Sequence, residues 1–107
     1  MTELDLVISA PRIETAAGTV ARRIGVSGGR ITAFVPIQTD IRAARTVELD
    51  DDVVLLPSLV DTHVHVNEPG RTEWEGFATA TRAAAAGGVT TIIDMPLNSL
   101  PPTVDPP

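Results

Sequence analysis

The C-terminal half of the chain predicts a strand, a helix and a second strand, and this order constrains the fold more than any other feature. The run Leu59–Val66 has the length and β-branched content of a buried strand. Alanine dominates the segment up to Ala86, Gly87-Gly88 predicts a helix end, and Val89–Asp94 is again apolar and β-branched. This order predicts a parallel pair of strands with a right-handed crossover. Such a pair needs further elements to cover both faces, so the sequence predicts part of a larger α/β fold.

The helical segment carries its own start signal and one apolar face. Thr72 and Glu75 have the spacing of a capping box, in which the threonine caps an amide one turn on and the glutamate reaches back. Apolar residues recur at spacings of three and four, which predicts one packed face. The members of this face are Trp74, Phe77, Ala80 and Ala84. We therefore expect a continuous helix from Thr72 to Ala86.

The residues before Pro57 predict short strands joined by turns. The expected strands are Asp5–Ile8, Ala21–Val26, Ile31–Val35, Thr46–Leu49 and Val53–Leu56. Ala10-Pro11 is expected to end the first strand. Gly28-Gly29 predicts a hairpin, because glycine accepts the positive φ of a tight turn. The change of character at Pro57 divides the chain into residues 1–56 and residues 57–107.

The composition excludes several classes of partner. A formal net charge of −6 disfavours nucleic acid, because an acidic surface repels phosphate backbones. The absence of cysteine rules out disulfides and thiolate metal ligands. No run approaches the roughly 20 apolar residues of a membrane-spanning helix, and the acidic N-terminus lacks the positive charge of a signal peptide. We expect a soluble, cytoplasmic protein with no nucleic-acid or membrane partner.

His63 and His65 are the only histidines of the chain, and both lie in the first of the two C-terminal strands. Residues two apart in a strand point to the same face, so the two imidazoles could converge on one divalent ion such as zinc. Asp61 is expected on the same face, where it could orient the two histidines without binding the ion itself. The alternative is a surface or packed pair, but burying two unpaired imidazoles in an apolar strand is costly.

The carboxylates that follow have simpler explanations than catalysis. Glu73 and Glu75 fall in the first turn of the expected helix, where the helix dipole favours negative charge. Glu68 lies in the loop after the strand and is a weaker candidate for a substrate contact. Arg71, in the same loop, is expected to be solvated.

The segment Leu56–His65 resembles the metal-binding signature of the amidohydrolase superfamily. That signature places a proline and a small residue before a strand that carries Asp-x-His-x-His, a pattern matched here by Pro57, Ser58 and Asp61. Ser58 stands where the superfamily commonly has glycine, which affects only the local turn. The earlier strands look like the small β-sandwich that precedes the barrel in the cyclic-amide hydrolases.

A narrower resemblance, to the allantoinases, rests on the segments His65–Phe77, Gly87–Thr91 and Asp94–Ser99. Dihydroorotases usually have an arginine two residues after the second histidine, where it holds the substrate carboxylate. This chain has Asn67 there, which fits a neutral ring such as allantoin. The resemblance implies that Asn98, and more weakly Asn67, contact the substrate.

The resemblance implies an α/β fold, in which a small β-sandwich portion (1–56) is followed by the first strand, helix and strand of an incomplete (β/α)₈ TIM barrel (57–107). It also implies two zinc ions, with His63 and His65 on the more buried one. A bridging carbamylated lysine, two further histidines and a catalytic aspartate would complete the site. None of them is in this chain, which has no lysine and no third histidine, so no catalytic residue is assigned here.

The implied reaction is hydrolysis of a cyclic ureide, allantoin to allantoate, in purine breakdown, and relatives are often tetramers. A complete barrel takes roughly 250 residues, so we expect the 107 residues to belong to a longer enzyme and to be inactive alone. Two alternatives stay open. One is a dihydroorotase- or hydantoinase-type cyclic amidase, and the other is a non-catalytic, truncated or structural relative.

Overall fold

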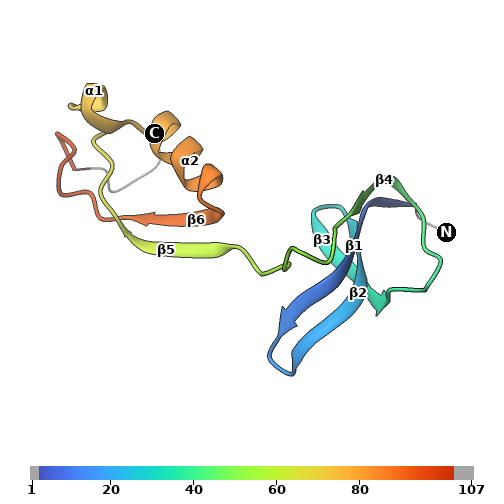
Figure 1. The fold of residues 1–107 in the computed structure, drawn as a ribbon. Coiled ribbons are helices and arrows are strands. Elements are labelled where there is room, and N and C mark those ends of the chain that lie inside the picture. The colour runs from blue at the N-terminus through green and yellow to red at the C-terminus, as the bar shows by residue number, and fades with distance from the viewer. Residues whose placement is uncertain (1–2, 103–107) are drawn as a thin grey trace. The chain divides into compact units, whose positions relative to one another are not determined.

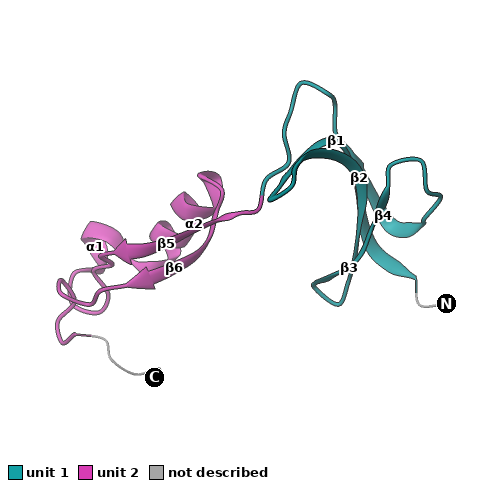
Figure 2. Cartoon of the chain, turned by 90° about the horizontal axis from the view of Figure 1, so that it is seen from below, with its two compact units in different colours: residues 1–56 teal, residues 57–107 magenta. Residues whose placement is uncertain are grey.

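The computed structural model describes residues 3–102. The chain divides into two compact units, Met1–Leu56 and Pro57–Pro107, which Figure 2 colours separately. Each unit contains its own sheet. The interpretation of the units as a sandwich portion and the start of a barrel stays a prediction, and residues 103–107 lie outside the described part. No helix within residues 3–102 is long and apolar enough to cross a membrane.

The first unit is one four-stranded sheet (Figure 1). Its strands are β1 (Leu4–Thr15), β2 (Gly18–Ser27), β3 (Arg30–Pro36) and β4 (Ala43–Glu48). They lie in the order β3-β2-β1-β4, with antiparallel pairing except between β1 and β4, which are parallel. The strand expected at Val53–Leu56 contributes only an isolated bridge between Leu55 and Ile13.

The predicted hairpin at Gly28-Gly29 is confirmed. It joins β2 to β3, and the two glycines have φ of 57° and 72°. The Gly28 N–H donates to the Asp5 carboxylate at 2.6 Å, which ties the turn back to β1.

The prediction that Ala10-Pro11 ends the first strand is wrong. β1 continues to Thr15, and its register against β2 shifts between Ala10 and Ile13. This irregularity leaves the proline outside the regular ladder, where its missing N–H breaks no cross-strand hydrogen bond. The longer strand brings Ala10 and Ile13 into the buried core beside Ile24.

The second unit has the predicted order of strand, helix and strand. β5 (Leu59–Val64) and β6 (Val89–Asp94) pair in parallel, and α2 (Phe77–Ala86) contacts β6. A one-turn helix, α1 (Thr72–Glu75), precedes α2 (Figure 1). The α/β fold class predicted from the sequence is confirmed.

The continuous helix predicted from Thr72 to Ala86 is interrupted at Gly76. This residue has an extended backbone, with φ −90° and ψ 173°, and separates α1 from α2. The predicted capping box does not form. Thr72 is already the first helical residue, and the Glu75 carboxylate accepts a hydrogen bond from the Thr79 hydroxyl at 2.7 Å instead of reaching back.

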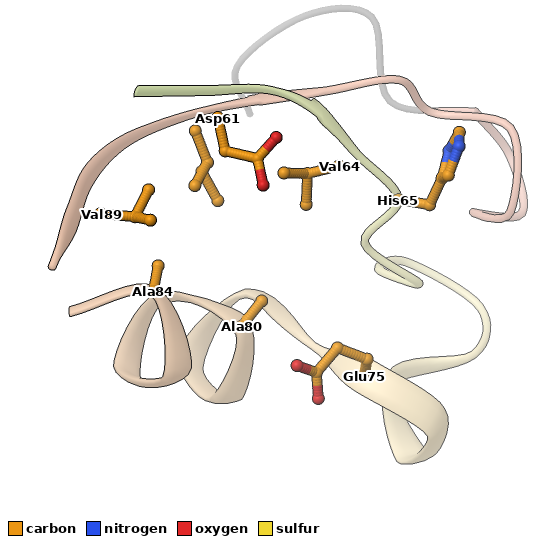
Figure 3. A pocket seen from close by; sticks show the side chains of 8 residues that line it. Asp61, Val64, His65, Glu75, Ala80, Ala84 and Val89 are labelled. Carbon is orange, nitrogen blue, oxygen red and sulfur yellow. The ribbon is translucent and has the colours of Figure 1, made fainter. Parts of the chain in front are cut away.

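The predicted apolar face is only partly formed. Ala80 and Ala84 lie toward the strands (Figure 3), whereas Trp74 is 65% exposed. The break at Gly76 interrupts the helical spacing on which the prediction depended. Trp74 instead lies against Arg71, whose guanidinium carbon is 4.8 Å from the ring centroid, so this arginine is less solvated than expected.

The buried strand predicted at Leu59–Val66 is shorter and more exposed than expected. β5 ends at Val64, and Leu59 and Val60 are each about 60% exposed. A parallel pair needs layers on both faces to bury its side chains, and the described residues supply one neighbouring strand and one helical layer.

Gly87 and Gly88 end α2, and only Gly88 needs to be glycine. Gly88 has φ of +80°, whereas Gly87 has φ of −88°. A Cβ added at Gly87 would lie 3.6 Å from the nearest atoms, which is an ordinary van der Waals distance. We expect Gly88→Ala to lower the free energy of unfolding by about 1 kcal/mol, because L residues are strained at positive φ. Gly87→Ala is the matched control and is expected to leave the free energy of unfolding unchanged. Urea denaturation followed by circular dichroism measures both, and equal losses would contradict this distinction.

Candidate metal centre

His63 and His65, called the histidine pair below, lie together where β5 ends. His63 is inside the strand, and His65 is the first residue after it. Their ring centroids are 5.1 Å apart, and the ring planes are almost perpendicular, at 82°. His63 is exposed and His65 is half-buried. The two imidazoles are therefore close enough to approach one ion, and neither is sealed in a core.

One hydrogen bond determines which nitrogen of His65 is available to a ligand. Its Nδ1 lies 3.0 Å from the Met95 carbonyl oxygen. A carbonyl can only accept a hydrogen bond, so Nδ1 carries the proton in this contact, and the neutral form of the ring has its lone pair on Nε2. A backbone carbonyl that holds one imidazole nitrogen is the usual way in which proteins orient a metal-binding histidine.

The loops that follow β5 and β6 are joined by three more hydrogen bonds. The Met95 N–H donates to the Val64 carbonyl at 2.8 Å, and the Val66 N–H donates to the Asp94 carboxylate at 2.9 Å. Farther along, the Leu100 N–H donates to the Pro69 carbonyl at 2.8 Å. His65 is thus held on both sides by the end of the neighbouring strand. This is the carboxyl-terminal edge of the parallel pair, where α/β barrels place their functional groups.

The Asp61 carboxylate contacts the backbone of His63, and its expected role in orienting the imidazoles stays a prediction. Its Oδ1 accepts a hydrogen bond from the His63 backbone N–H at 3.0 Å. The register against β6 shifts between Asp61 and Val64, so the simple alternation that predicted a shared face does not hold along this stretch. Figure 3 shows the Asp61 and Val64 side chains directed toward α2, with the His65 ring at the other end of the view. The contact to the His63 amide still ties Asp61 to the backbone of one candidate ligand.

A pocket of about 220 Å³ lies between the two strands and α2 (Figure 3). Its lining residues are Asp61, Val64, His65, Glu75, Ala80, Ala84, Val89 and Ile92. Two of these side chains, Asp61 and Glu75, carry carboxylates, and small alanines supply the helical wall. The pocket is the space between the strand and helix layers and touches the histidine pair only through His65.

The two asparagines predicted to contact substrate have different surroundings. Asn67 is 9% exposed, its N–H donates to the Glu75 carbonyl at 2.8 Å, and its Oδ1 is buried without a hydrogen-bond partner in the described structure. Asn98 is half-buried in the loop after β6. Both follow the carboxyl ends of the strands, so they share an edge with the histidine pair, but Asn98 is the more accessible of the two.

Sequence reasoning did not identify Met95 as the partner of His65, or Asp94 as the acceptor for the neighbouring Val66 N–H. The signal was present, because carboxyl ends of parallel strands meet at one edge and both residues stand at the end of β6. The carbonyl of Met95 carries no side-chain signature, however, so its contact with His65 needed the structure.

The donor set present here fits part of a metal site. Within residues 3–102, no three or more histidine, cysteine or acidic side chains gather in a group that could hold an ion. The histidine pair supplies two nitrogen donors of the type that zinc prefers, and His65 has its second nitrogen engaged as a ligand requires. The remaining donors of a four-coordinate site would have to come from elsewhere.

Comparison with known proteins points to one family. Residues 54–103 match the model of the amidohydrolase family. The chain is 60% identical over 104 residues to an allantoinase from Streptomyces avermitilis, covering 96% of this chain and 23% of that enzyme. It is 48% identical over 102 residues to an allantoinase from Arabidopsis thaliana, covering 92% of this chain and 20% of the plant enzyme.

Solved structures agree in fold. The L-hydantoinase of Arthrobacter aurescens superposes with a TM-score of 0.76 at 30% identity, over 94% of this chain and 22% of that one. A D-hydantoinase gives a TM-score of 0.70 at 34% identity, over 85% of this chain and 20% of its own. The chain thus spans about a quarter or less of the length of the relatives that it matches. Together with the Asp-x-His-x-His strand and the hydrogen bond to His65, these matches identify residues 54–103 as an amidohydrolase-family segment.

Proposed function

We propose that this chain supplies the first metal-binding strand of an allantoinase, an enzyme that opens the ring of allantoin by hydrolysis to give allantoate in purine catabolism. The observation that carries the proposal is the histidine pair, with ring centroids 5.1 Å apart and the Nδ1 of His65 held by the Met95 carbonyl. The relatives named allantoinase, at up to 60% identity, support this substrate over other cyclic amides.

The residues of the chain have distinct roles in this proposal. His63 and His65 would hold the metal ion, with Asp61 steadying His63 through its backbone amide. Asn98, and Asn67 after a local rearrangement, would contact the ureide. When bound, a divalent ion would supply Lewis-acid activation of water and of the ring amide.

The finer features of the proposal come from the family resemblance. They are two zinc ions, a bridging carbamylated lysine contributed from beyond these residues, a cytoplasmic location and a tetrameric assembly. Zinc agrees with the two imidazole donors of the histidine pair. A small neutral ureide agrees with the absence of a cationic residue at position 67, where asparagine stands.

A chimaera tests the proposed activity. This chain would replace the matching 104-residue segment of the Streptomyces avermitilis allantoinase. We expect the chimaera to hydrolyse allantoin, the same chimaera with His63→Ala to lose at least about 100-fold in kcat/KM because a metal ligand is missing, and the 107-residue chain alone to show no turnover. Allantoate release is the measurement, and an inactive but folded, zinc-loaded chimaera would contradict the proposal.

A second candidate activity is hydrolysis of hydantoin, because both hydantoinases noted above share this fold at 30% identity or more. The chimaera and the parent allantoinase would be assayed with allantoin, hydantoin and dihydroorotate side by side. A shift of preference toward hydantoin in the chimaera would support this alternative. A preference for allantoin equal to that of the parent supports the main proposal.

A further inference from the structure

At Gly76, between α1 and α2, a side chain from outside both helices caps the start of α2. Gly76 is buried and extended, and its side-chain position offers no group to cap α2. The first turn of α2 also contains no acidic residue. The helix is ten residues long, so its first N–H groups need acceptors from elsewhere.

Glu68 provides one of these acceptors. The Phe77 N–H, at the first position of α2, donates to the Glu68 carboxylate at 2.8 Å. A carboxylate at a helix N-terminus is favoured twice, by the hydrogen bond and by the positive end of the helix dipole. Glu68 lies nine residues before Phe77, in the loop that follows the histidine pair.

The backbone at Gly76 is shaped to admit this carboxylate. A Cβ at position 76 would lie 2.9 Å from Oε2 of Glu68 and 2.8 Å from Cγ2 of Thr72. Contacts this short force one partner to move, so a larger residue would displace Glu68. The helix break, which the sequence pattern did not predict, therefore coincides with the docking point of the Glu68 side chain.

The same loop is anchored at other points as well. The Asn67 N–H donates to the Glu75 carbonyl at 2.8 Å, and the Leu100 N–H donates to the Pro69 carbonyl at 2.8 Å. A further bond, from the Arg71 N–H to the Asn67 carbonyl at 3.1 Å, closes a turn within the loop. On the other side, the His65 ring and the Val66 N–H are bonded to the end of β6. Only two residues separate Glu68 from His65, so the contact of Glu68 with α2 lies close along the chain to a candidate ligand.

We propose that Glu68 is a positioning residue, which holds the loop after β5 onto the N-terminus of α2 and thereby keeps His65 in place to bind a metal ion. The inference rests on the proposed metal-binding role of the histidine pair. It assigns to Glu68 no contact with substrate or with the reacting atoms. It also gives a reason for the glycine at position 76.

Zinc affinity of the allantoinase chimaera described above tests the proposal, because the chimaera supplies the metal donors that these residues lack. We expect Glu68→Ala to weaken zinc binding about tenfold, as removal of a residue that orients a metal ligand commonly does. Glu68→Gln keeps an acceptor oxygen and is expected to restore most of the affinity. Glu73→Ala is the matched control, because Glu73 is an exposed glutamate in α1 with no described hydrogen bond. This variant should bind zinc like the unaltered chimaera. Isothermal titration calorimetry with zinc gives each affinity.

A second variant and a second measurement keep the outcome clear. Gly76→Ala leaves Glu68 intact but crowds its carboxylate, so it should weaken zinc binding in the same direction as Glu68→Ala. Hydrogen exchange of the Phe77 amide, measured without metal, should be faster in both variants because its acceptor is lost or displaced.

The results separate this proposal from the proposed function. If the unaltered chimaera binds zinc no more tightly than its His63→Ala variant, the metal-binding role falls, and the positioning role falls with it. If the unaltered chimaera binds zinc through the histidine pair and Glu68→Ala binds it equally tightly, with faster Phe77 exchange, only the positioning role is overturned. Weaker zinc binding together with faster exchange, and recovery in Glu68→Gln, supports it.

Discussion

Substitution of both His63 and His65 by alanine is expected to abolish zinc binding at concentrations that saturate the unaltered chain. The two imidazoles are the only histidines, and the sequence has no cysteine to replace them as a soft donor. Each single substitution should leave one donor and weaken binding by at least about tenfold, since two ligands from one strand act together. Zinc content after dialysis, measured by atomic emission, gives the result directly.

Thr62→Ala is the matched control for the histidine substitutions. Thr62 lies in β5 immediately before His63 and is exposed, so its loss should change neither the strand nor the retained zinc. Zinc retained at full stoichiometry by the double alanine variant would show that the ion binds elsewhere. The assignment of the histidine pair as ligands would then be wrong.

Substitution of Ile13 by alanine is expected to be the most destabilising single truncation in the first unit. Ile13 is 5% exposed in a core whose other buried members are Ala10 and Ile24. Truncation of a buried isoleucine costs about 3 kcal/mol, as lost transfer energy plus the cavity left behind. Small domains have about 5 kcal/mol in total, so this loss removes a large part of the stability.

Ile31 offers a control of the same residue type in the same sheet. It is 68% exposed in β3, and Ile31→Ala should change the free energy of unfolding by less than about 0.5 kcal/mol. Urea denaturation followed by circular dichroism measures both variants. Equal destabilisation by the two substitutions would show that the core does not lie around Ile13.

Several elements could be predicted because their signals are local. The Gly28-Gly29 hairpin follows from the need for positive φ, and Gly88 marks the end of α2 for the same reason. The parallel pairing of β5 and β6 follows from two apolar, β-branched runs on either side of an alanine-rich helix. The family resemblance was likewise readable from the Asp-x-His-x-His strand, and the comparisons confirm it.

Other features escaped prediction because they depend on partners far along the chain. A register shift between Ala10 and Ile13 allows β1 to continue beyond Pro11. A second register shift, between Asp61 and Val64, interrupts the regular pairing of β5 with β6. Trp74 was expected to pack but is exposed, because Gly76 breaks the helix before Phe77. The cap of α2 comes from Glu68, which no local capping pattern includes.

The sequence by itself therefore determined the kinds of elements, their order and the presence of two imidazoles two residues apart. Those properties follow from backbone propensity and from side-chain chemistry, which act over a few residues. Only the tertiary structure decided which nitrogen of His65 is held by the Met95 carbonyl, and which side chain caps α2 after the break, the Glu68 carboxylate. These outcomes needed the fold, because a hydrogen bond between residues 9 or 30 positions apart forms only after packing brings donor and acceptor within about 3 Å.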